Sequence, residues 1–116
     1  MTAAQHDRLT GFNASLKMRG VSVTLHTNGA TDADAQCLAL IQPVTAKLRA
    51  QFDLADEQIT HLVHVLRTSL VDGQGNPFDR KTVEEIDRAD SQHTYRVLNF
   101  TDDAQRPDVF FHCILA

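Results

Sequence analysis

Several residue types that mark particular protein classes are scarce in this sequence. Tryptophan is absent, and the aromatic residues are one Tyr and six Phe, so Val, Leu, Ile and Ala have to supply most of a core. No run of about 18 apolar residues occurs, and no basic segment followed by an apolar run stands at the start. We therefore expect neither a membrane span nor a secretory signal peptide.

Charge and cysteine content exclude further classes. The formal net charge is −4, and the basic residues form isolated pairs rather than a stripe, which disfavours tight binding to a nucleic acid backbone. Cys37 and Cys113 lie far apart with no CxxC spacing, so neither a zinc ribbon nor a redox pair is indicated. We expect two buried, reduced thiols, with a disulfide between them as the alternative.

The length of 116 residues and the 42% hydrophobic content fit a single domain, residues 1–116. Leu9, Phe12 and Leu16 recur at helical spacing within residues 1–20, and Gly20 would end the helix. A disordered lead is the other interpretation of this segment. Residues 21–116 are expected to form the core of the domain.

Alternation of apolar and polar residues predicts strands in the rest of the chain. Val21, Val23 and Leu25 alternate with polar residues, and Asn28 and Gly29 then predict a turn. Further strands are expected at residues 35–42, 59–70, 83–86, 95–100 and 109–115. Five to six antiparallel strands at this spacing predict a mainly β fold, a small barrel or sandwich with a short N-terminal helix.

Residues 44–58 fit two patterns. Ala46, Leu48, Ala50, Phe52 and Leu54 alternate with polar residues, but the apolar positions also fit a helix. We favour a long extended arm that is ordered by a neighbouring subunit. Its candidate interface residues are Val44, Lys47, Leu48, Arg49, Phe52 and Leu54.

Residues 72–78 concentrate turn-forming residues. They begin like a calcium loop, but Pro77 stands where such a loop needs glycine, and Gly73 and Gly75 precede no helix that could bind a phosphate. A turn that faces a partner or a channel is the preferred interpretation. Its candidate residues are Asp72, Gln74, Asn76 and Phe78.

Other groupings of reactive side chains have simpler interpretations. An offset of three on a strand places His61 and His64 on opposite faces, where they cannot share a metal ion. Adjacent residues such as His112 and Cys113 also point to opposite faces. The acidic pairs Glu84/Glu85 and Asp102/Asp103 are expected to be solvated. The sequence thus indicates no catalytic residue, no metal ligand and no cofactor.

Three segments together resemble the head-tail joining proteins of tailed phages, also called head-closure or head-completion proteins. They are residues 38–44 (LALIQPV), 60–67 (THLVHVLR) and 95–100 (YRVLNF), and the resemblance extends over about residues 21–116. It implies a small β-barrel without enzymatic activity. A longer connection around residues 72–79 is where this sequence departs from the family.

The resemblance also implies partners and a location. The chain would form a homo-oligomeric ring of about six or twelve copies, through contacts between two different patches of the subunit. The ring would bind portal or adaptor proteins on the head side and tail-terminator or other tail proteins on the other side. Genomic DNA would pass through it without specific binding. The protein would be made in the host cytoplasm and reside in the neck of the virion.

Three alternatives stay open. A tail-terminator or tail-completion protein is another small ring component of the same particle. A small cysteine-dependent enzyme would use Cys37 or Cys113 with a histidine. A soluble β-barrel that binds a small ligand would be a monomer with a pocket.

Overall fold

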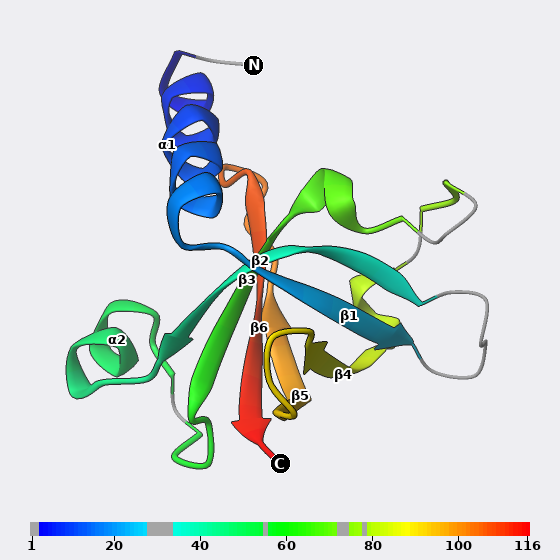
Figure 1. Cartoon of the computed structure of the whole chain (residues 1–116). Helices are drawn as coiled ribbons and strands as arrows, with labels where there is room; N and C mark the ends of the chain where they lie inside the picture. The colour runs from blue at the N-terminus through cyan, green and yellow to red at the C-terminus, as the bar shows by residue number, and fades with distance from the viewer. Residues whose placement is uncertain (1–2, 28–33, 55, 72–74, 78) are drawn as a thin grey trace.

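The protein folds as a closed barrel of six antiparallel strands in the order β1-β2-β3-β6-β5-β4 (Figure 1). The computed structural model describes residues 3–27, 34–54, 56–71, 75–77 and 79–116. The strands are β1 Val21–Thr27, β2 Ala35–Pro43, β3 His61–Leu66, β4 Val83–Arg88, β5 Thr94–Thr101 and β6 Asp108–Leu115. The helical elements are α1 Ala3–Arg19, α2 Ala46–Gln51 and the 3₁₀ turns η2 Arg67–Ser69 and η3 Arg80–Thr82. The predicted mainly β fold with an N-terminal helix is confirmed.

The main core fills the inside of the barrel. Alternate residues of β1 point inward, and both Val23 and Leu25 are buried, as their pattern predicted. The largest side chains in this core are Tyr95 and Phe111, from β5 and β6. Each fully buried aliphatic or aromatic side chain stabilises the fold by roughly 1.5–3 kcal/mol. Such a packed interior leaves the outer faces of the strands to interact with other elements.

Residues 44–58 are not an extended arm, so that prediction is wrong. Residues 46–51 form α2, which begins after Thr45, whose side-chain oxygen accepts a hydrogen bond from the Leu48 backbone N–H. Val44, Phe52 and Leu54 pack against the outer face of β3 and β6, in a second core cluster with Ile59, Leu62 and Phe110. The segment therefore covers part of its own barrel, beside the C-terminal end of β2 (Figure 1).

Helix α1 ends at Gly20, as predicted, and leads directly into β1. Leu16 is buried at the contact of α1 with the barrel, where the helix lies against β2. The Gly20 backbone N–H donates to the Leu16 carbonyl at 2.8 Å. A Cβ atom on Gly20 would lie 2.3 Å from that same oxygen, so only glycine fits this close approach without a backbone shift.

We expect Gly20→Ala to destabilise the protein by about 1–3 kcal/mol, because the added methyl group collides with backbone. Gly11→Ala is the matched control. A Cβ on Gly11, in the interior of α1, would have no atom within 4 Å. That change should raise helix stability by up to about 1 kcal/mol. Chemical denaturation of both variants checks the expectation, and equal effects would contradict it.

The hairpin of β5 and β6 also agrees with the sequence prediction, but it contains a bulge. Val97 pairs with Cys113 and Asn99 pairs with His112, so Leu98 is an extra residue in β5. A second register shift lies between β1 and β4, where His26 pairs with Glu85 and Thr27 with Val83. Here Glu84 is the extra residue. Both bulges lie in the part of the barrel wall formed by β4 and β5.

Candidate functional site

The candidate interface residues of segment 44–58 separate into two groups. Val44, Phe52 and Leu54 are used inside the subunit, in the second core cluster. The Arg49 guanidinium was expected to face a partner, but it donates to the backbone carbonyls of Asp56, Glu57 and Ile59. Lys47 is exposed and Leu48 is half-buried on α2. An interface role for this segment stays a prediction. Such a contact would use the outer face of the segment, since its inner face packs against the barrel.

The candidate turn falls mostly outside the described residues. Asp72, Gln74 and Phe78 are not described, whereas Asn76 is and has an exposed side chain. Val71 and Pro77 form an isolated antiparallel bridge across this turn. The prediction that the turn faces a partner or a channel therefore stays a prediction.

A buried polar cluster is centred on Asp108, at the start of β6. Its carboxylate is almost fully buried and accepts from His64 Nδ1 at 2.9 Å. Arg106 Nε and Nη2 donate to the two oxygens at 3.0 and 3.2 Å. The other ring nitrogen of His64 lies 3.1 Å from Gln42 Oε1 on β2. One buried carboxylate thus connects β3, β6 and the turn before β6.

Aromatic stacking continues this cluster along the outer face of β6. The Phe110 ring stacks against His64 at 5.2 Å and His112 at 5.6 Å between ring centroids, and Phe52 meets its edge at 4.9 Å. The Arg106 guanidinium carbon lies 5.4 Å from the Phe110 centroid. Burial is the main cause that lowers the pKa of His112, and the nearby His64 adds to it. Packing of this kind rigidifies the wall under segment 44–58.

Burial acts to raise the pKa of Asp108, but hydrogen bonds from His64 and Arg106 outweigh it and bring the pKa down to about 2. The folded pKa is thus below the ordinary value of 3.8, so the carboxylate adds stability above about pH 4 that is lost as pH falls towards 2. We expect the free energy of unfolding to decrease by roughly 2–3 kcal/mol over this range from Asp108 alone. Urea denaturation at a series of pH values measures it. Asp108→Asn should show a shallower decrease, and an unchanged one would contradict the assignment.

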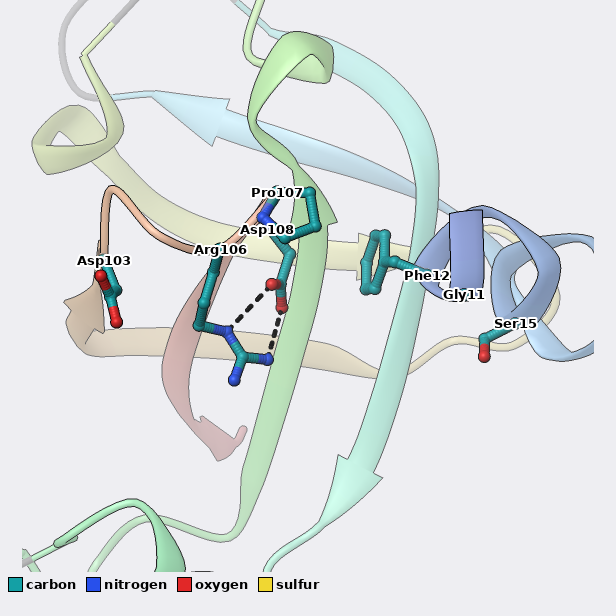
Figure 2. Close-up of a pocket in the computed structure, with 7 residues that line it drawn as sticks. All are labelled: Gly11, Phe12, Ser15, Asp103, Arg106, Pro107 and Asp108. Atoms are coloured by element: carbon teal, nitrogen blue, oxygen red, sulfur yellow. Dashed lines mark hydrogen bonds and ion pairs between the residues drawn. The ribbon is translucent and has the colours of Figure 1, made fainter. Parts of the chain in front are cut away.

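A cleft of about 470 Å³ lies between α1 and the turn before β6. Figure 2 shows the Phe12 ring pointing from α1 towards Pro107, with Arg106 held against Asp108 on the other side. Gly11, Ser15 and Asp103 complete the lining. Two of the guanidinium nitrogens of Arg106 are bound to Asp108, so its charge is largely neutralised within the protein. This makes the cleft a weak candidate for binding an anion.

Asp102 does not behave as a solvated surface carboxylate, which corrects the expectation for the pair Asp102/Asp103. Its side chain is buried, and its two oxygens form ion pairs with Arg67 and Arg80. Arg67 also donates to the backbone carbonyls of Asp103 and Arg106. The two ion pairs of Asp102 therefore fasten η2 and η3 to the end of β5. The expectation holds for Glu84, Glu85 and Asp103, which are exposed.

The histidines lie on the strand faces that their positions predicted, and Cys113 is buried as expected, whereas Cys37 is only half-buried. His61 makes an edge contact with Tyr95, whereas His64 binds Asp108 on the other face of β3. His112 contacts Thr101 Oγ1 at 2.8 Å, and Cys113 lies in the main core. Both cysteines are free thiols, and burial raises the pKa of Cys37 to about 11 and of Cys113 to about 12. Within the described part of the chain, no group of three or more His, Cys, Asp or Glu side chains could hold a metal ion.

Exposed apolar side chains occur on opposite walls of the barrel. Leu38 on β2 is 45% exposed and Leu98 on β5 is 38% exposed. In the closed strand order, β2 and β5 are separated by two strands in either direction. Met18 at the end of α1 and Leu115 at the end of β6 are the other exposed large apolar side chains among the described residues. Of these four side chains, Leu38 and Leu98 lie on walls that face away from each other.

Comparison of this chain with protein-family models, with curated proteins and with solved structures found no match. The described helices include none with the length and apolar character needed to cross a membrane.

Proposed function

We propose that this chain is a noncatalytic structural subunit of a tailed-phage neck, which joins the DNA-filled head to the tail as part of a ring. The three segments that resemble head-tail joining proteins lie in or around β2, β3 and β5. The observation that carries the proposal is the pair of exposed apolar side chains, Leu38 and Leu98, on opposite walls of the barrel. A ring needs two different patches on each subunit, and opposed walls supply them.

The barrel changes how such a ring would be held together. Strand pairing through an arm was the expected route, but residues 46–51 are helical and the six strands close on themselves. A closed barrel leaves little free backbone for a neighbour to pair with. Side-chain packing between walls is therefore the contact that we propose, with head and tail partners bound at the two ends of the ring.

Electron microscopy of particles assembled without this gene tests the function. We expect filled or leaking heads beside separate, finished tails, and we expect the gene supplied in trans to restore joined particles. Heads that carry normal tails would contradict the proposal. Finished heads beside tails that fail to complete would favour a tail-terminator role instead.

Substitution of both cysteines separates a joining protein from a thiol enzyme. A thiolate nucleophile needs a low pKa and an accessible sulfur, whereas burial raises the pKa of both thiols. We expect the double variant Cys37→Ala/Cys113→Ala to complete infectious particles, provided that circular dichroism shows it to be folded. A folded double variant that yields no infectious particles would support the enzyme.

A further inference from the structure

We propose that copies of this chain contact one another by packing Leu98 of one copy against the surface formed by Leu38 and the two clefts beside it on the next. This inference rests on the proposed ring function and specifies the subunit contact on which such a ring depends. The residues that carry it come from the β5 bulge on one wall and from β2, α1 and η2 on the other wall.

The receiving surface consists of two clefts on either side of Leu38. One, of about 570 Å³, lies between α1, β2 and η2 and has Leu16, Leu66 and Val71 in its lining. The other, of about 320 Å³, lies over β1 and β2. Residues 36–38 line both clefts. Leu38 is therefore a ridge with an apolar hollow on one side and a second hollow on the other.

The surface that packs against it is the bulge of β5. Because Leu98 is an extra residue between two paired positions, it is displaced from the regular ladder, and its side chain is exposed. Its neighbours Arg96 and Asn99 are exposed polar residues, so Leu98 is an isolated apolar projection within a polar surrounding. A single apolar anchor with a polar rim is the usual arrangement at the centre of a protein interface.

Strand pairing places the two surfaces at a similar height. Leu38 on β2 is paired with Ser22 on β1. When the β4–β5 register is continued by two residues, Leu98 lies opposite Val83, which is paired with Thr27 on β1. Followed the other way, through β6 and β3, the offset has about the same size and the opposite direction. Because the strands of a closed barrel are inclined to its axis, two offsets of similar size and opposite direction place Leu38 and Leu98 at a similar height along that axis.

The two surfaces carry charges of opposite sign, although Arg96 beside Leu98 adds one basic group to the acidic side. Lys17 lines the larger cleft, and Arg19 follows it in the exposed last turn of α1. On the opposite wall, β4 carries Glu84 and Glu85 beside β5, and both are exposed. Glu84 is itself the extra residue of the second bulge. Opposite charges across an interface favour one orientation of the partner and disfavour others.

Sedimentation velocity of the full chain at increasing concentration tests this contact. The wild type should associate, and Leu38→Asp and Leu98→Asp should each be monomeric. An equimolar mixture of the two variants should form dimers and nothing larger, because only one intact pair of surfaces is left. Leu115→Asp is the control, since Leu115 is 39% exposed but lies in neither surface. Unchanged thermal unfolding of each variant confirms that it is folded.

Charge reversal supplies a second readout. Lys17→Glu and Glu84→Lys should each weaken association by about tenfold, and the double variant should recover most of the loss. A wild type that stays monomeric at every concentration would overturn the contact, as would normal association of Leu38→Asp or Leu98→Asp. The second result would leave the ring function intact, because a ring could use other surfaces. Conversely, if particles that lack the gene carry normal tails, the proposed neck function is wrong. A contact between copies that sedimentation had detected would still hold in that case.

Discussion

Asp108→Ala is expected to lower the free energy of unfolding by about 3–5 kcal/mol. The substitution removes the carboxylate that contacts both His64 and Arg106, at distances of 2.9 to 3.2 Å. His64 is buried, so it would be left beside an empty position without its acceptor. Because domains of this size are stable by only about 5–15 kcal/mol, equilibrium denaturation should detect the loss easily.

The chain contains a closely matched control for this prediction. Arg88 Nε and Nη2 donate to the two oxygens of Asp90 at 2.8 Å, the same two-residue spacing that joins Arg106 to Asp108. Asp90 is exposed, so solvent screens that pair and Asp90→Ala should cost far less. Similar losses in the two variants would show that burial and the His64 contact are not what makes Asp108 important.

Phe110→Ala is expected to lower the free energy of unfolding by about 3–5 kcal/mol, because it opens a cavity in the second core cluster. Phe110 contacts Phe52, His64, His112 and Arg106, so its removal leaves segment 44–58 without its main support. Hydrogen exchange should become faster at the amides of α2, while those of β1 and β4 keep their relative protection.

Leu98→Ala is the comparison for that experiment, since the side chain is exposed and its loss should change stability little. If the amides of α2 exchange no faster in Phe110→Ala than in Leu98→Ala, segment 44–58 does not depend on the second core cluster for its position.

The barrel strands could be predicted from the sequence for two reasons. β1 alternates apolar and polar residues, whereas β3 and β6 are short, mainly apolar runs, as expected of strands that are covered on both faces. Segment 44–58 could not be predicted in the same way, because Leu48 and Phe52 satisfy both a strand and a helix pattern. A local signal was nevertheless present. Thr45 is a good N-cap, and residues 46–51 are all strong helix formers. Propensity and capping together therefore favour the helix where periodicity is ambiguous.

The polar cluster around Asp108 could not be predicted, because it depends on strand register. His64 and Asp108 are 44 residues apart, and they meet only because β3 pairs with β6 so that Leu66 lies opposite Asp108. The same applies to Asp102, whose partners Arg67 and Arg80 come from two other connections. Apolar periodicity indicates which residues are buried, but it does not indicate which buried polar groups meet.

The position of β6 in the barrel has a consequence for how the chain reaches its native state during synthesis. β6 is translated after all the other strands, yet it lies between β3 and β5. Its partners in β3 are 42 to 52 residues earlier, from Leu66 with Asp108 to His61 with Cys113. Until the ribosome has released β6, the nascent chain keeps two unsatisfied strand edges, and pairing over such distances makes folding slow. Until β6 is available, these two edges can pair with another chain, so this stage of synthesis is the one at which we expect misassembly.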